Sequence, residues 1–150
     1  MPVASYVRGR DGRTLDEHWQ GSPRAHLGST VPGFPNLFML LGPNTGLGHS
    51  SMVYMIESQV AYVIDALKAM RRRGAATAEV RPEAVRDFND GIDERMRDTV
   101  WNTGCSSWYL DATGRNSTLW PDWTFAFRRA SRFDPTAYEL GAATPARVPA

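Results

Sequence analysis

The sequence predicts an α/β fold, and three consecutive segments support that prediction. A short apolar run from Asn36 to Leu41 is followed by a Gly/Pro/Asn-rich turn from Gly42 to Gly48, and then by a long amphipathic pattern that begins near Ser50. The apolar run is short, shows no alternation and is bounded by Pro and Gly, which is typical of a strand covered on both faces. Strand, glycine-rich turn and helix in this order are the usual connection in α/β proteins.

Composition and charge narrow the range of partners. The chain has 150 residues, 42% of them hydrophobic, and a formal net charge of +1. This balance indicates neither nucleic acid nor a membrane surface as a partner. We expect a cytoplasmic location, because no run approaches the roughly 18 apolar residues of a spanning helix and the first residues lack a signal-peptide core. A single cysteine, Cys105, excludes an internal disulfide.

The residues before the apolar run predict short elements. A turn at Arg10 to Arg13 predicts a small hairpin, and Asp16 to Trp19 predicts one helical turn that the sequence Gly21-Ser22-Pro23 breaks. The stretch from Val31 to Pro35 cannot be helical, because each proline pushes the preceding residue into extended backbone.

Two amphipathic helices are predicted after the turn. The first opens at Ser50 or Ser51, whose hydroxyl is the expected N-cap, and ends at Gly74 in a left-handed conformation. Its predicted buried stripe consists of Val53, Ile56, Val60, Val63, Leu67 and Met70. A short strand at Ala78 to Arg81 precedes the second helix, which opens at Pro82. The predicted buried stripe of this helix consists of Val85, Phe88, Ile92, Met96 and Val100.

A long aromatic loop begins at Trp101, where the periodicity ends. Ordered loops longer than about 12 to 15 residues are usually functional, and the many tryptophans argue against disorder. The alternation of Thr124 to Phe127 predicts a closing strand, and the Ala/Pro-rich stretch from Gly141 to Ala150 predicts a loose tail.

The glycine-rich turn is the main functional candidate. Glycines permit close approach of the backbone to a ligand, and a helix start offers unpaired N–H groups to an anionic or nucleotide-like cofactor. A plain connecting turn remains the alternative. The turn lacks the third glycine of a dinucleotide fingerprint and the lysine of a P-loop. A serine hydrolase is a remote alternative, because no histidine follows His49. His18, His26 and His49 share no ligand spacing, so no metal is expected.

Several motifs resemble a known family. Four motifs are similar, in the same order, to the C-terminal part of class B flavoprotein monooxygenases, the Baeyer–Villiger and flavin-containing monooxygenases. From the N-terminus they are LDEHWQGSPRAHLGSTVPGFPN, GFPNLFMLLGPNTGLGHSS, MIESQVAYV and VWNTGCSSWYLDATGRNSTLWP. The likeness covers most of Tyr6 to Tyr138. It implies a C-terminal fragment of a Rossmann-like FAD/NAD(P)-binding flavoprotein, with one buried strand, two amphipathic helices and a long aromatic loop.

The resemblance also implies a division of the chain. Residues 1–30 would be a lead-in on the cleft side of the FAD/NADP region, 31–100 the C-terminal part of the FAD-binding domain, 101–140 an aromatic cleft loop with a closing strand, and 141–150 a flexible tail.

FAD and NADPH are the cofactors that the resemblance implies, with a small organic substrate and oxygen as reactants. The reaction would be oxygenation of a ketone, or of nitrogen or sulfur, through a flavin peroxide. The expected cofactor contacts are Asn44, Thr45, Leu47, Gly48, His49, Ser50 and, for NADP(H), Trp108 with Arg115 as a polar partner. The expected substrate-cleft residues are Trp19, Tyr109 and Asn116. Tryptophans of this kind equally often cover a core. No residue is assigned as catalytic.

A non-catalytic piece is the competing prediction. Members of the family are several times longer, and they carry two Gly-rich fingerprints and a catalytic arginine that this sequence lacks. A single buried strand cannot form a complete parallel sheet. The chain could therefore be a fragment, or a subunit that complements a missing N-terminal flavoprotein portion, and we expect it to bind FAD weakly or not at all on its own.

Overall fold

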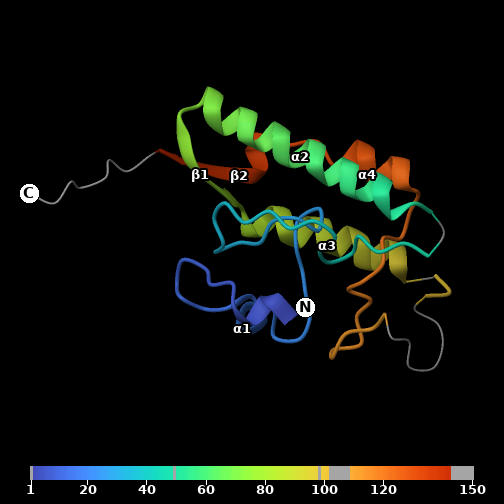
Figure 1. Cartoon of the computed structure of the whole chain (residues 1–150). Helices are drawn as coiled ribbons and strands as arrows, with labels where there is room; N and C mark the ends of the chain where they lie inside the picture. The colour runs from blue at the N-terminus through green and yellow to red at the C-terminus, as the bar shows by residue number, and fades with distance from the viewer. Residues whose placement is uncertain (1, 49, 98, 102–108, 143–150) are drawn as a thin grey trace, which may run out of the picture.

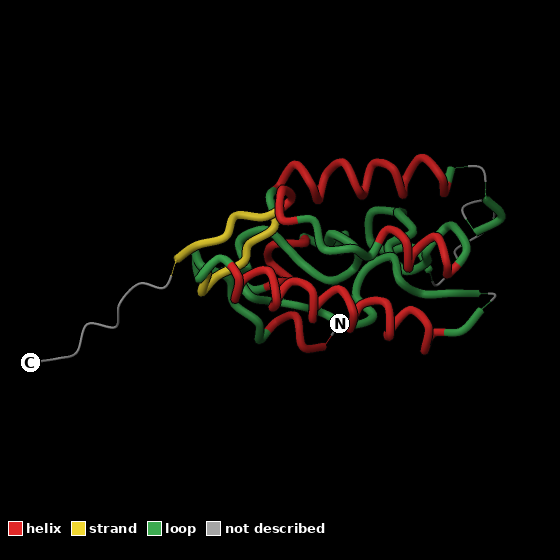
Figure 2. The backbone as a smooth tube through the Cα atoms, turned by 90° about the horizontal axis from the view of Figure 1, so that it is seen from above, coloured by secondary structure: helices red, strands yellow, loops and turns green. Residues whose placement is uncertain are grey.

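The structure is a computed structural model that describes residues 2–48, 50–97, 99–101 and 109–142. Its long helices are α2 (Met52–Arg72) and α3 (Pro82–Met96), joined by strand β1 (Ala75–Val80). The short elements are η1 (Pro2–Ser5), α1 (Leu15–Trp19), α4 (Thr124–Ala130), η2 (Pro135–Ala137) and β2 (Tyr138–Ala142). Irregular segments fill the space between the helices, and α4 lies beside α2 (Figure 1, Figure 2).

The predicted hairpin, the helical turn after it and the non-helical stretch 31–35 are all confirmed. Arg8 and Thr14 pair across the predicted turn. Thr14 then caps α1, because its hydroxyl accepts from the N–H of Glu17 while the Glu17 carboxylate accepts from the N–H of Thr14 at 2.7 Å. Gln20 ends α1 in a left-handed conformation with φ 48°. The stretch 31–35 contains no helix.

The ends of the two long helices follow their sequence signals. Helix α2 ends before Gly74, which has a φ of +61° as expected for a left-handed terminal residue. Pro82 occupies the first turn of α3. Ser51 is the N-cap of α2 by its extended backbone, but its side chain makes no capping hydrogen bond, so the expected hydroxyl cap is not formed.

The predicted buried stripe of α2 is confirmed at Met70 but wrong at Val53, Val60 and Leu67, which are exposed. Val60 and Leu67 are 40% and 54% exposed, and the buried residues of the helix are Met55, Ser58, Gln59, Tyr62, Ala66, Ala69 and Met70. Most of this buried face is small or polar, which lets the loop segments approach the helix closely. The predicted stripe of α3 is largely confirmed, since its buried residues include Val85, Ile92 and Met96, although Val100 lies beyond the helix and is exposed.

The predicted strand from Asn36 to Leu41 is not formed in this chain, because both of its ends have positive φ, 60° and 55°. Asn36 forms strand-like hydrogen bonds with β1. Its N–H donates to the Ala78 carbonyl, and its side-chain oxygen accepts from the Ala78 N–H, both at 2.9 Å. Strand β1 pairs instead with β2 in an antiparallel ladder, in which Val80 lies opposite Tyr138.

The predicted closing strand from Thr124 to Phe127 is the start of helix α4. Phe127 is completely buried and Phe125 is 65% exposed. Residues two apart share one face in a strand but lie on nearly opposite sides of a helix, so this burial pattern fits the helix. Four alternating residues were too few to decide between the two. Strand β2 also includes Gly141 and Ala142, which the sequence assigned to the tail.

Candidate functional site

The glycine-rich turn is fastened to a distant stretch of chain, residues 115–120, which we call the clamp segment. The N–H of Asn44 donates to the Ser117 carbonyl at 2.9 Å, and the N–H of Gly46 donates to the Thr118 carbonyl at 2.8 Å. These bonds resemble a short parallel ladder. Two of the main-chain donors that the sequence analysis offered to a cofactor are therefore used within the chain.

Asn44 holds the turn from inside. Its side-chain amide donates to the carbonyls of Asn116 at 2.8 Å and Leu119 at 2.9 Å, and its side-chain oxygen accepts from Arg115 at 2.8 Å. The residue is buried and left-handed, with φ 57°. Because both of its donors and its acceptor are engaged, the side chain positions the turn and has no donor left for a cofactor.

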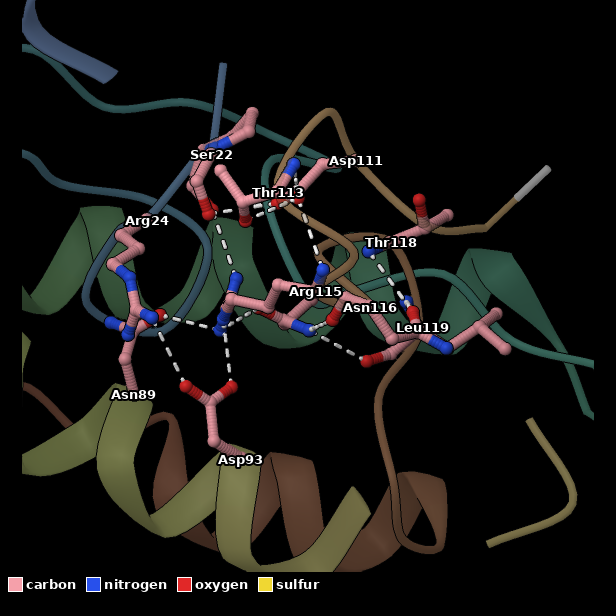
Figure 3. Close-up of polar contacts among 12 residues, drawn as sticks. Ser22, Arg24, Asn89, Asp93, Asp111, Thr113, Arg115, Asn116, Thr118 and Leu119 are labelled. Atoms are coloured by element: carbon pink, nitrogen blue, oxygen red, sulfur yellow. Dashed lines mark hydrogen bonds and ion pairs between the residues drawn. The ribbon is translucent and has the colours of Figure 1, made fainter. Parts of the chain in front are cut away.

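Arg115 is the centre of this arrangement (Figure 3). Its Nε donates to Asp93 Oδ1 at 2.7 Å, and its Nη1 donates to the Pro23 carbonyl at 3.1 Å. Its Nη2 donates to the side-chain oxygens of Asn44 at 2.8 Å and Asn89 at 3.0 Å. The guanidinium thereby joins the lead-in, the turn, α3 and the clamp segment. The expected contact between Arg115 and NADP(H) is not supported, since the side chain is only 9% exposed.

Charges around Arg115 are balanced. Burial lowers the pKa of the guanidinium, and the carboxylate of Asp93 opposes this by favouring the charged form. Arg24 binds the other oxygen of Asp93 at 3.2 Å. Burial acts to raise the pKa of Asp111, but hydrogen bonds from Thr113 and Ser22 to its carboxylate lower that pKa overall. The carboxylate of Asp111 is therefore ionised at neutral pH.

The opposite side of the turn contacts the loop around Gly28. A Cβ atom on Gly28 would lie 2.2 Å from Thr45 Cγ2, and one on Gly42 would lie 2.2 Å from the Gly28 carbonyl oxygen. Only glycine allows the two backbones to approach this closely. Gln59 of α2 fixes the start of the turn, because its Oε1 accepts from the N–H of Leu41 at 2.8 Å.

A cavity of about 270 Å³ opens beside the turn. Its lining includes Thr45 and Gly46 from the turn, Ser117 and Thr118 from the clamp segment, and Met52, the first residue of α2. None of the lining side chains is charged. The main-chain N–H of Thr45 donates to no other described residue. The cavity therefore suits a neutral, partly aromatic group with a hydrogen-bonding edge.

Asn116, the residue before Ser117 in the clamp segment, has an unpaired side-chain donor. Its side-chain oxygen accepts from the N–H groups of Thr118 at 3.3 Å and Leu119 at 3.1 Å. Its Nδ2 is buried and has no hydrogen-bond partner among the described residues. An unpaired buried donor costs about 1 to 3 kcal/mol, so it marks a position where an oxygen from a ligand or an ordered water would be bound.

The other expected cofactor residues have different surroundings. Leu47 packs against the cluster that contains Met55 and Trp120. Gly48 is covered by the indole of Trp101, whose Cη2 would lie 2.8 Å from a Cβ at this position. Ser50 is exposed. His49 and Trp108 lie outside the described residues.

The expected cleft residues do not gather at one cavity. Trp19 is buried, its indole N–H donates to the Arg24 carbonyl at 2.9 Å, and it borders a second, open hollow of about 630 Å³. The lining of that hollow includes His18 and Arg86 but neither Tyr109 nor Asn116. Tyr109 packs edge-on against Trp101 with ring centroids 5.8 Å apart.

The described residues contain neither a cluster of metal ligands nor a helix that could span a membrane. Nowhere in residues 2–48, 50–97, 99–101 and 109–142 do three His, Cys, Asp or Glu side chains gather as metal ligands. Within the same ranges, no helix has the length and apolar character needed to cross a bilayer.

Comparison with known proteins identifies the family. No protein-family model matches the chain. A Baeyer–Villiger monooxygenase of Streptomyces coelicolor is 52% identical over 151 residues, which cover 99% of this chain. One from Pseudomonas aeruginosa is 53% identical over 137 residues, which cover 89% of it. The solved structure of an oxidised steroid monooxygenase bound to NADP superposes with a TM-score of 0.78 and 32% identity over 90% of the chain. The chain is a segment of the class B flavoprotein monooxygenase family.

This monooxygenase segment is a small part of the proteins it matches. It spans 29% of the length of the Streptomyces relative, 26% of the Pseudomonas relative and 26% of the steroid monooxygenase chain. A cyclohexanone monooxygenase from Rhodococcus sp. Phi1 bound to NADP⁺ gives a TM-score of 0.75, with 27% identity over 91% of the segment. An FAD-binding monooxygenase of Aspergillus niger is 34% identical over 128 residues. The predicted fold class is confirmed, as part of an FAD/NADP-binding α/β protein.

The cavity of the monooxygenase segment fits one edge of such a cofactor. Its volume of about 270 Å³ is below the usual range of about 300 to 1,000 Å³ for sites that enclose a drug-sized ligand. It nevertheless offers an uncharged wall, the main-chain N–H of Thr45 and the N-terminal end of α2, where helix N–H groups lack internal partners. A whole dinucleotide would need further walls from outside this segment.

Proposed function

We propose that this chain supplies one wall of the cofactor site in an FAD- and NADPH-dependent monooxygenase that oxygenates a ketone, or a nitrogen or sulfur centre, of a small organic substrate. The observation that carries the proposal is the clamped turn, whose uncharged cavity is lined by Thr45 and Gly46 of the turn and by Ser117 and Thr118 of the clamp segment. The family supports it, because relatives are named as Baeyer–Villiger or FAD-binding monooxygenases and solved neighbours bind NADP.

The chain's own residues bind and orient the cofactor in this proposal. The main-chain N–H of Thr45 forms the polar edge, with the buried Nδ2 of Asn116 as the proposed second donor, while Met52 supplies an apolar contact. The positive end of α2 favours negative charge on a bound ring. FAD, when bound, supplies the electron transfer and the oxygen chemistry. The clamp segment keeps the edge rigid and excludes water from its inner side.

The proposal extends to the divisions of the chain. Residues 31–100 would belong to the FAD-binding domain and residues 101–140 to the cleft, with 1–30 as the lead-in and 141–150 as a tail. Trp108 is proposed to position NADP(H), and Tyr109 to face the substrate. Trp19 borders a separate hollow, so its proposed place is at the outer part of the cleft.

A chimera provides the test. These 150 residues would replace the matching segment of the Streptomyces coelicolor monooxygenase. We expect the chimera to bind FAD in a ratio of about one to one and to consume NADPH and oxygen with a ketone. A chimera that is folded by circular dichroism but binds no FAD would contradict the proposal.

A single-atom variant sharpens the test. Asn116→Asp keeps the side-chain oxygen that accepts from Thr118 and Leu119, and it replaces the unpaired donor with an acceptor oxygen that carries negative charge. A net hydrogen bond is worth about 0.5 to 1.5 kcal/mol, so the dissociation constant for FAD should rise by about two- to tenfold. The free energy of unfolding, measured on the same variant, separates lost binding from lost folding.

By itself the chain is expected to bind FAD weakly and to have no monooxygenase activity. The observation that favours this non-catalytic role is the 36–41 segment, which has no strand ladder here. Titration of the isolated chain with FAD, followed by flavin fluorescence, should give no saturation at micromolar concentrations. Tight stoichiometric binding would show that the segment needs no other part.

A further inference from the structure

Gln59 is a completely buried amide in the middle of α2, and it does not line the cavity beside the turn. Its Oε1 accepts from the N–H of Leu41, the residue before the turn, at 2.8 Å. Its Nε2 donates to the carbonyls of Leu27 at 3.2 Å and Gly28 at 3.3 Å, and to the Ser29 hydroxyl at 3.0 Å. One side chain thus joins α2 to the start of the turn and to the loop 27–29.

The hydrogen bonds of Gln59 fix the distances between these segments. Burial of an amide costs free energy unless its donors and its acceptor are bonded. Gln59 meets this requirement with groups that other segments supply, so α2, Leu41 and the loop 27–29 must keep their present spacing. A side chain on a helix, with its acceptor bonded on one side and its donors on the other, holds both neighbours rigidly.

Gly28 transmits this position to the turn. It lies between Gln59 and Thr45, since a Cβ on Gly28 would be 3.4 Å from Gln59 Nε2 and 2.2 Å from Thr45 Cγ2. The Thr45 hydroxyl donates to the Gly42 carbonyl at 2.7 Å, which fixes the side chain within the turn. A displacement of the loop 27–29 therefore displaces Thr45, because close-packed backbones leave no gap that could absorb it.

Thr45 is the point at which these contacts reach the cavity. It lines the cavity, and its main-chain N–H donates to no other described residue. This N–H is the donor that the proposed function assigns to the edge of the cofactor. Its position depends on Gly28 and, through Gly28, on Gln59.

We propose that Gln59 is a positioning residue for the cofactor: by holding the loop 27–29 against α2, it determines where the Thr45 N–H meets a bound flavin ring. The inference rests on the proposed function and deepens it, because it names the residue that sets the geometry of the site without touching the ligand. A fixed N–H aimed at the ring stabilises negative charge on it. Displacement of this donor should therefore make the bound flavin harder to reduce.

Three substitutions on α2 separate the possible effects. Gln59→Leu removes the acceptor and both donor hydrogens. Gln59→Glu keeps an oxygen for the Leu41 N–H but supplies at most one donor hydrogen in place of two. Ser58→Ala is the matched control, because Ser58 is also buried on α2 and its hydroxyl donates within the helix, to the Tyr54 carbonyl at 2.7 Å.

Amide NMR of the isolated chain gives the first measurement. In Gln59→Glu, the Leu41 amide should exchange with solvent within about twofold of its original rate, while the Thr45 amide resonance should move further than in Ser58→Ala. In Gln59→Leu, the Leu41 amide should also exchange about two- to tenfold faster, the equivalent of one net hydrogen bond. If Gln59→Leu does not fold, Gln59→Glu decides. A Thr45 resonance that moves no further than in the control would overturn the inference.

The bound flavin gives the second measurement, in the Streptomyces coelicolor chimera. Gln59→Glu should raise the dissociation constant for FAD by about two- to tenfold. It should also shift the visible absorption bands of the bound flavin and make its reduction potential more negative, whereas Ser58→Ala should change none of these. A loss of stability in Gln59→Glu without a change in the flavin spectrum or potential would mean a purely structural role and would overturn the inference.

The outcomes separate this inference from the proposed function. If the chimera binds FAD but Gln59→Glu alters neither the Thr45 resonance nor the flavin spectrum, the inference is wrong and the proposed function stands. If Gln59→Glu moves the Thr45 resonance in the isolated chain but the unsubstituted chimera binds no FAD, Gln59 is confirmed as the residue that positions the turn and the proposed function is wrong.

Discussion

Replacing Arg115 by methionine should destabilise the chain by about 3 kcal/mol. The substitution keeps an unbranched side chain but removes four hydrogen bonds and the ion pair with Asp93. Breaking a buried pair costs about 3 to 5 kcal/mol. We place the loss at the lower end of that range, because Asp93 is partly exposed and keeps its contact with Arg24. The side-chain oxygens of Asn44 and Asn89 would lose a charged donor in a buried site.

Urea unfolding measures this loss. For a chain of this length, about 3 kcal/mol corresponds to a decrease in Tm of roughly 6 to 12 °C. Arg115→Lys should recover less than half of the stability, because a single ammonium cannot reproduce the planar fork. Arg13→Met is the control, since its pair with Asp11 is largely exposed and should contribute little to stability. A loss below about 1 kcal/mol for Arg115→Met would refute the role of Arg115 as the centre of the clamp.

Three further predictions follow from the same structure. In chemical denaturation, Gly28→Ala should lower the free energy of unfolding by at least about 2 kcal/mol more than Gly114→Ala, because both glycines have positive φ but only Gly28 lacks room for a Cβ. Equal losses would contradict the close approach of the Gly28 backbone to the turn. Burial lowers the pKa of His26, so the unfolded state binds more protons than the folded state as the pH falls below the ordinary histidine pKa of about 6.5, and the free energy of unfolding should fall by at most about 1.4 kcal/mol from pH 7.5 to 5.5. His26→Gln should make the free energy of unfolding less dependent on pH in this range; an unchanged dependence would mean that another group causes it. In the isolated chain, Met55→Ala should lower the free energy of unfolding by about 2 to 5 kcal/mol and Leu67→Ala by less than about 1 kcal/mol, as measured by calorimetry, because Met55 is buried and Leu67 is exposed. A larger loss for Leu67→Ala than for Met55→Ala would support the burial pattern that the sequence predicts.

Local signals in the sequence predicted where some elements begin or end. Gly74 supplies the left-handed residue after α2, and Pro82 opens α3. These signals work because they depend on φ preferences and on hydrogen bonds between residues a few positions apart. The family, too, was recognisable from motifs in their order.

The neighbours of each element could not be predicted in the same way. The period of α2 predicts that an apolar stripe exists, but only the packed loops determine that Ser58, Gln59 and Ala66 face inward while Leu67 faces solvent. The apolar run from Asn36 to Leu41 has the composition of a strand, and its state depends on a ladder partner. Four alternating residues in α4 fitted two periods equally well.

The sequence by itself determined the family, the end of α2 and the start of α3. Only the tertiary structure decided that Asn44 and Arg115, 71 residues apart, hold the glycine-rich turn together, and that the buried Nδ2 of Asn116 has no partner among the described residues. The reason is physical: conformational preference is local to a residue and its neighbours, whereas hydrogen-bond satisfaction and burial depend on which distant segments meet.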